Sequence, residues 1–137
     1  MAERPIYDPA TDPMMHHMGF IRVLDSDVGA GRISIEFEAK QVQCHSGNIV
    51  QGGYVAGWID NVMATAVSLK TNYELVPLSL DIKIAFYGAA NPGIVVAEGW
   101  TEKMGRRTAF AEGLLRTREG RIIAKGMSTL ALKPMAR

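Results

Sequence analysis

The chain has 137 residues, of which 47% are hydrophobic and 21% are charged, so one domain with a packed core is expected. The formal net charge of +1 excludes the strong basic excess of a general nucleic-acid-binding domain. Cys44 is the only cysteine, which excludes an internal disulfide bond and fits a reducing compartment. Residues 1–13 contain charges and prolines without an apolar run, so we expect no secretory signal. We expect a soluble cytoplasmic protein that binds neither nucleic acid nor a membrane.

The first part of the chain predicts an extension followed by a hairpin. Residues 1–18 form the extension, in which residues 14–18 add one helical turn. Residues 20–27 and 32–39 are expected to be strands, because a glycine-containing turn separates them and the second strand alternates strictly between apolar and polar residues. Residues 40–50 then form a polar loop.

Residues 51–70 predict one long helix that is apolar on nearly every side, which is typical of a helix buried in a core. Asp60 is the only ionisable side chain before the last residue of this helix, and a buried carboxylate is costly unless it has a partner or a use. Gly52 and Gly53 at the helix start allow the first N–H groups to approach a ligand closely. A positive helix end followed eight residues later by an acid is therefore the main candidate for a functional site.

The remainder of the chain predicts four more strands joined by short turns. With the first two, the expected strands cover residues 20–27, 32–39, 78–87, 94–103, 107–118 and 121–133. Consecutive hairpins favour a largely antiparallel sheet, and one apolar helix with one such sheet predicts an α+β fold in which the sheet curls around the helix. We expect a single domain over residues 19–137.

Several short motifs fall at the boundaries of these elements. They are the loop His45-Ser-Gly-Asn-Ile-Val-Gln51-Gly52-Gly53, the helical acid Asp60, the strand start Ser79-Leu-Asp81, and the late segments Met104-Gly-Arg-Arg-Thr-Ala109 and Glu119-Gly-Arg-Ile-Ile-Ala-Lys-Gly126. In these motifs the chain resembles the acyl-CoA thioesterases of the PaaI-like type, which have the hotdog fold. The resemblance runs from about Gly19 to Leu132 and implies a six-stranded antiparallel sheet wrapped around one central helix.

The loop departs from the pattern of this family at three positions. His45 stands where the family usually has asparagine, Gln51 where it usually has histidine, and Asn48 where glycine is common. The glycine pair and the acid are both retained. The departures bear on the choice of substrate and on how the carbonyl group is held.

Thioester hydrolysis, which the resemblance implies, needs a group that stabilises the carbonyl oxygen and a group that attacks or activates water. The Gly52 N–H at the helix start suits the first task, and a ring N–H of His45 is expected to add a second donor. Asp60 suits the second task, either as general base or as nucleophile, and Ser79 is expected to orient the water or the acid. A solvated Ser79 on the polar side of its strand is the simpler alternative.

Substrate binding is assigned to residues in the same loop and at a strand turn. Gln51, Gly53 and Asn48 are expected to shape the loop around the substrate. Lys103, Arg106 and Arg107 cluster at a turn, where arginine side chains can bind the phosphates of coenzyme A, although such a turn is more often simply solvated.

We expect neither a cofactor nor a metal ion, because the adjacent His16 and His17 point in different directions and make a poor metal-binding pair. The resemblance implies a site shared across a dimer interface, so the expected partners are an acyl-CoA and a second copy of the chain, as a homodimer or a dimer of dimers. Uncovered sheet edges favour the same self-association.

Two other functions stay open from the sequence. A non-catalytic hotdog protein that binds acyl-CoA or an aromatic ligand would account for His45 and Gln51. A hotdog hydratase ranks last, because the histidine-containing loops usual in those enzymes do not occur in this chain. The acyl group and the pathway are not readable from the sequence.

Overall fold

The computed structural model describes residues 7–134. Its elements are η1 (Pro9–Thr11), α1 (Pro13–His17), β1 (Phe20–Asp27), β2 (Arg32–Ala39), η2 (Gln41–Gln43), β3 (Cys44–His45), β4 (Ile49–Val50), α2 (Gly52–Lys70), β5 (Leu75–Phe86), β6 (Gly93–Met104), β7 (Thr108–Thr117) and β8 (Ile122–Pro134). The expected helical turn, long helix and six long strands are all present. The loop expected over residues 40–50 contains η2 and the small β3–β4 hairpin, which are too short to leave a periodic signal in the sequence.

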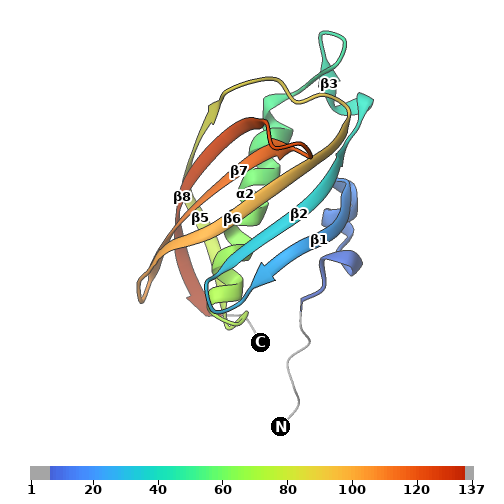
Figure 1. Cartoon of the computed structure of the whole chain (residues 1–137). Coiled ribbons are helices and arrows are strands. Elements are labelled where there is room, and N and C mark those ends of the chain that lie inside the picture. Colours follow the sequence, from blue (N-terminus) through green and yellow to red (C-terminus); the bar gives the residue numbers. More distant parts are fainter. Residues whose placement is uncertain (1–6, 135–137) are drawn as a thin grey trace.

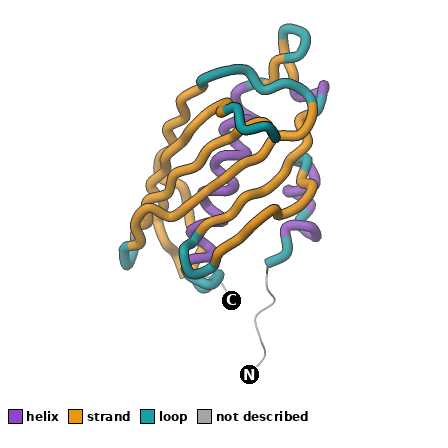
Figure 2. The backbone as a smooth tube through the Cα atoms, viewed as in Figure 1, coloured by secondary structure: helices purple, strands orange, loops and turns teal. Residues whose placement is uncertain are grey.

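The long strands form one antiparallel six-stranded sheet in the described part of the chain, in the order β1-β2-β6-β7-β8-β5. The sheet curves around α2, which lies against one of its faces (Figures 1 and 2). This arrangement confirms the predicted α+β hotdog architecture. The boundary expected between an extension, residues 1–18, and a domain, residues 19–137, stays a prediction, and its two ends lie outside the described residues.

Three glycines form a row across the sheet where α2 crosses it. Gly99 on β6 pairs with Gly113 on β7, which pairs with Gly126 on β8. A Cβ atom at Gly99 would collide with the backbone carbonyl of Val62 in α2, and one at Gly126 would lie 2.9 Å from Cγ2 of Ile59. The row therefore lets the backbone of the helix approach the backbone of the sheet closely.

One face of α2 packs into the core and the other does not. The sheet-facing side chains are buried, and they are Val55, Trp58, Ile59, Val62, Met63, Ala66, Val67 and Leu69. The outward face carries small or polar residues such as Gly57, Asp60 and Ala64, which are only half-buried. The expectation of a helix buried all round is thus wrong for the isolated protomer, because the sheet covers one face only.

The segment before β1 covers part of this outward face. Met15 is 1% exposed, and its sulfur atom accepts a hydrogen bond from Nδ2 of Asn61 at 3.2 Å. The Trp58 indole donates to the Met18 carbonyl at 2.8 Å. The helical turn predicted at residues 14–18 is therefore held against α2 by two contacts between residues far apart in the sequence.

Strand β5 carries a bulge that changes which side chains face the helix. Its register with β8 shifts between Ser79 and Asp81, and Leu80 is the extra residue. The bulge interrupts the hydrogen-bond ladder between β5 and β8, and at this point Oδ1 of Asp81 accepts a hydrogen bond from the backbone N–H of Thr129 at 2.9 Å. The apolar side chains of the predicted alternation are largely exposed, at 49% for Leu78, 65% for Leu80 and 40% for Ile82, because β5 is an edge strand and its bulge breaks the period of two.

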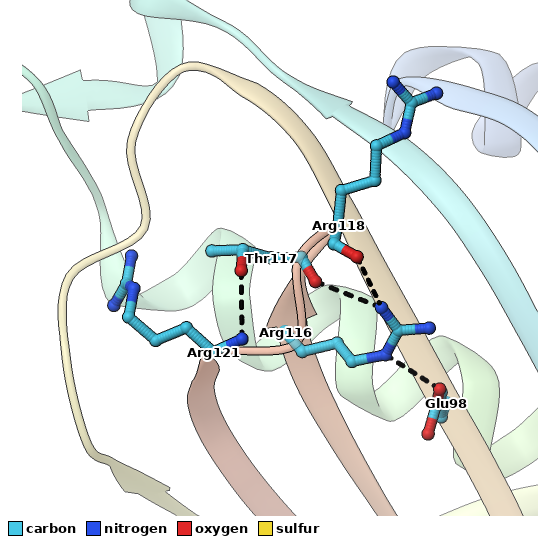
Figure 3. A network of polar contacts seen from close by, with 5 residues as sticks. All are labelled: Glu98, Arg116, Thr117, Arg118 and Arg121. Atoms are coloured by element: carbon cyan, nitrogen blue, oxygen red, sulfur yellow. Dashed lines mark hydrogen bonds and ion pairs between the residues drawn. The ribbon is translucent and has the colours of Figure 1, made fainter.

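Charged side chains fasten the β7–β8 turn to its neighbours. Arg116 donates to Glu98 at 2.9 Å and also to the carbonyl groups of Thr117 and Arg118, while the N–H of Arg121 donates to the Thr117 hydroxyl (Figure 3). The network closes the hairpin at the end of the sheet where α2 begins, which the pictured ribbons place together (Figure 1).

Within residues 7–134, no helix combines the length and the hydropathy needed to cross a membrane.

Replacing Gly99 by alanine should lower the free energy of unfolding by about 1–3 kcal/mol or more, because the new methyl group forces α2 away from the sheet. The matched control is Gly29→Ala, where the nearest atom to the added Cβ is 3.5 Å away. Urea denaturation of the two variants measures the difference. Equal midpoints for both variants would contradict the close packing of helix and sheet.

Candidate active site

The hairpin formed by β3 and β4 leads the chain into α2. Its turn contains Ser46 and Gly47 at positive φ angles of 47° and 89°. His45 is exposed, and its Nδ1 atom lies 3.0 Å from the Ser46 hydroxyl. The Asn48 carbonyl accepts from the Asn91 amide at 2.9 Å, which ties the hairpin to the β5–β6 loop. His45 and Asn48 thus lie on the hairpin that precedes the helix start, with contacts that serve the hairpin itself.

Gln51 is the N-terminal cap of α2. Its side-chain Oε1 accepts the N–H of Gly53 at 2.7 Å, and its own N–H donates to the Gln43 carbonyl. The expected shaping role of Gln51 has a definite form here, since its amide satisfies one of the donors that a helix start leaves free. The Gly53 N–H is consequently occupied by Gln51 and is not open to a ligand in this conformation.

The Gly52 N–H, in contrast, has no hydrogen-bond partner among residues 7–134. It is the first N–H of a 19-residue helix with no acidic side chain in its first turn. The helix dipole therefore gives this donor a positive environment that is not neutralised locally. Such a donor is suited to an oxygen atom on which negative charge develops.

Asp60 and Ser79 form the second part of the candidate site. The Ser79 hydroxyl donates to Oδ1 of Asp60 at 2.9 Å, joining the middle of α2 to β5. No residue in the described range is bonded to Oδ2, which stays available for a substrate or water. Asp60 is half-buried, so the expectation of an enclosed acid is wrong for one protomer, because it lies on the face of α2 that the sheet leaves uncovered. Ser79 is exposed in one protomer, as its solvated alternative expects, but its hydroxyl also has a definite partner in Asp60.

One protomer does not bring these two parts together. Gly52 and Asp60 are separated by eight residues of a continuous helix, which corresponds to about 12 Å along its axis. A reacting carbonyl group must lie within about 3–3.5 Å of its attacking group. The donor and the acid of one chain therefore cannot act on the same carbonyl.

The basic residues lie in a third place. Lys103, Arg106 and Arg107 line a hollow of about 470 Å³ at the turn between β6 and β7. This turn lies at the end of the sheet opposite the β3–β4 hairpin (Figure 1). The structure thus gathers the three predicted cations, but away from Gly52 of the same chain.

A further hollow of about 450 Å³ occupies the sheet face that points away from α2. Phe110 and Met127, which are 43% and 51% exposed, line it together with Glu102 and Glu112. The pKa of Glu112 is raised because its carboxyl group shares a hydrogen bond with Glu102, with smaller effects of burial and of the charge of Glu102. Within residues 7–134, no group of three or more potential ligand side chains is arranged to hold a metal ion.

Phe86 is a neighbour of the helix start that the sequence pattern did not indicate. A Cβ atom added to Gly52 would lie 3.3 Å from Cζ and 3.4 Å from Cε1 of the Phe86 ring. The apolar alternation of β5 places Phe86 on the helix side of the sheet, but no local signal tells that its ring packs on a backbone 34 positions earlier.

Comparisons with known proteins identify the family of the chain. The family model of the thioesterase superfamily matches residues 47–124, which include the helix start, Asp60 and Ser79. No curated protein gives a significant match.

Solved structures share the whole fold. A phenylacetic acid degradation-related protein from Ralstonia eutropha is 21% identical, with 95% of this chain and 92% of that chain covered and a TM-score of 0.80. A variant of the phenylacetic acid degradation protein PaaI from Thermus thermophilus is 20% identical, with 88% of this chain and 98% of that chain covered and a TM-score of 0.75. A hypothetical thioesterase protein from Streptococcus pneumoniae, in a structure with coenzyme A, is 17% identical, with 85% of this chain and 88% of that chain covered and a TM-score of 0.74.

These likenesses confirm the expected PaaI-like hotdog fold, and the family model covers more than half of the chain. The chain therefore belongs to the thioesterase superfamily.

Proposed function

We propose that the protein hydrolyses acyl-CoA thioesters, and that the free N–H of Gly52 at the start of α2 is the observation that best supports this. The carbonyl oxygen of the thioester accepts this N–H, which stabilises the negative charge that builds on the oxygen. In the general-base route, Asp60 takes a proton from the water molecule that attacks the carbonyl carbon; in the nucleophilic route, its carboxylate attacks directly and water then hydrolyses the resulting mixed anhydride. In both routes the carbon–sulfur bond breaks, and the thiolate of coenzyme A leaves and takes up the proton that water gives up. The products are the free acid and coenzyme A.

Asp60 acts as general base or as nucleophile through Oδ2, because Ser79 already donates to Oδ1. That hydrogen bond fixes the carboxylate in one orientation, which suits either role. Ser79 thus serves as a positioning residue. His45 supplies a second donor to the carbonyl oxygen when its ring leaves Ser46, while Gln51, Gly53 and Asn48 hold the loop in shape.

The site is completed by a second copy of the chain, because Gly52 and Asp60 of one protomer are too far apart. Edge strand β5 is the natural contact, since it exposes a row of apolar side chains and an unpaired backbone edge within the described chain. In a two-fold antiparallel pairing centred between Ile82 and Lys83, Phe86 stands opposite Ser79 of the partner subunit. Gly52 then lies near the partner's Asp60.

The same two-fold axis reverses the ends of the two sheets, so the basic turn of one protomer comes to the end where the partner's helix begins. Lys103, Arg106 and Arg107 are then placed to bind the phosphates of coenzyme A. The apolar hollow around Phe110 and Met127 offers a surface for a dimer of dimers.

Asp60→Asn should lower the rate of hydrolysis by about 10²–10⁴-fold, because the amide neither accepts a proton nor attacks the carbonyl. The measurement is release of free thiol from a panel of short, medium, long and aromatic acyl-CoAs, with circular dichroism to show that the fold is kept. Full activity of the variant would sink the assignment of Asp60. If the folded wild-type protein binds coenzyme A but turns over nothing in the panel, the non-catalytic binding protein replaces the enzyme as the better reading of His45 and Gln51.

Gly52→Pro tests the oxyanion donor without breaking the helix. Proline is well tolerated at the first helical position, and Gln51 already has the extended conformation, with φ −60° and ψ 135°, that proline requires of its predecessor. The loss of one N–H should reduce kcat by about 10²–10³-fold. Gly52→Ala is the control, because it adds a Cβ at the same place and keeps the N–H. Equal rates for the two variants would show that the N–H has no catalytic part.

Mixing inactive chains tests the shared site. A heterodimer of one Asp60→Asn chain and one Gly52→Pro chain, purified through two different tags, should recover about half of the wild-type rate, since one of its two equivalent sites is complete. Donor and acid from the same chain would instead leave both sites of the heterodimer broken, and no activity would return.

A further inference from the structure

The side chain of Phe86 stands at an unusual place on the sheet. It is 55% exposed although it lies on the helix side of β5, opposite the buried Ala124 of β8. Ile84, two residues earlier on the same face, packs against the core. The ring of Phe86 thus extends beyond the packed core, toward the start of α2, and half of its surface is exposed in the single protomer.

The edge of this ring lies beside the position that a Cβ atom of Gly52 would occupy. At distances of 3.3 and 3.4 Å from an ideal Cβ at Gly52, a methyl group there would touch the ring, which would have to shift by no more than a few tenths of an ångström. The N atom and a Cβ atom are both bonded to Cα, each about 1.5 Å from it, so the free N–H of Gly52 lies within about 6 Å of the same ring edge. An oxygen atom bound to that N–H brings its own substituents to the exposed part of Phe86.

We propose that Phe86 determines the acyl specificity of the site, with its exposed ring forming the apolar wall against which the acyl group lies. This inference rests on the proposed function and deepens it: the preferred thioesters carry an apolar acyl group larger than acetyl. Phe86 contacts the acyl group and takes no part in the proton transfers.

The size of the effect follows from the burial of apolar surface. One methylene group in an apolar pocket is worth about a 10–200-fold change in kcat/KM. An acetyl group presents only one methyl group to the ring and gains little, whereas a hexanoyl or phenylacetyl group presents several carbon atoms. Aromatic rings add a preference for edge-to-face or offset contacts with the phenyl group of such a substrate.

The test compares kcat and KM for acetyl-, hexanoyl- and phenylacetyl-CoA in the wild-type protein and in Phe86→Leu and Phe86→Ala. Phe86→Ala should lower kcat/KM at least about tenfold for the two larger substrates and less than about threefold for acetyl-CoA, with Phe86→Leu between. Tyr87→Ala is the matched control, because Tyr87 is the next residue, is 62% exposed and lines a hollow on the other face of the sheet with Lys83 and Lys125. It should change none of the three values by more than about threefold.

A loss that is the same for all three substrates would overturn the inference, as would an equal effect of Tyr87→Ala. Light scattering checks that each variant keeps the oligomeric state of the wild type. If Phe86→Ala fails to fold or assemble, the ratio of kcat/KM values in Phe86→Leu decides, because leucine keeps an apolar side chain at this position.

A binding experiment separates this inference from the proposed function. Calorimetric titration with coenzyme A and with its non-hydrolysable S-hexyl thioether needs no turnover. The wild type should bind the thioether more tightly than coenzyme A, and Phe86→Ala should remove at least about tenfold of this preference. If the wild type hydrolyses no thioester but still prefers the thioether, and Phe86→Ala removes that preference, only the proposed enzymatic function is contradicted. If Phe86→Ala binds the thioether with the same preference as the wild type, the role of Phe86 is contradicted.

Discussion

The close packing of the α2 backbone against the sheet is the constraint on which the other features depend. The glycine row at Gly99, Gly113 and Gly126 lets two backbones meet where most sheets would place side chains. A helix held at this depth buries one face completely and fixes the position of everything on the other face. Both Gly52 and Asp60 are carried by this helix, so substitutions in the row, far from either residue, would move both together.

Much of the fold could be predicted from the sequence because its strands and its long helix have characteristic patterns of apolar and polar residues. The alternation in residues 32–39 predicts a strand, and the long, mostly apolar stretch of residues 51–70 predicts a helix. Short turns between the later strands favour an antiparallel sheet. Gly52 and Asp60 could be singled out because a glycine pair at a helix start and an acid in an apolar helix are visible locally.

The rest of the site depends on contacts that leave no local trace. The bulge at Leu80 is invisible in a strand that alternates well, yet it decides that Ser79 meets Asp60. The packing of Phe86 on Gly52 joins positions that are adjacent only after the sheet has formed. The sequence predicts an enclosed Asp60 and the structure leaves it half-buried, because the amino-acid composition of a helix does not tell how many of its faces the same chain covers.

The side chain that caps α2 determines how the start of this helix responds to pH. Gln51 holds the Gly53 N–H with an amide, a group that neither gains nor loses a proton in water at any pH a folded protein meets. The histidine usual at this position in the PaaI-like pattern titrates in the physiological range. In this chain, acidification or alkalinisation of the surroundings therefore leaves the cap, and the orientation of the neighbouring Gly52 N–H, as they are.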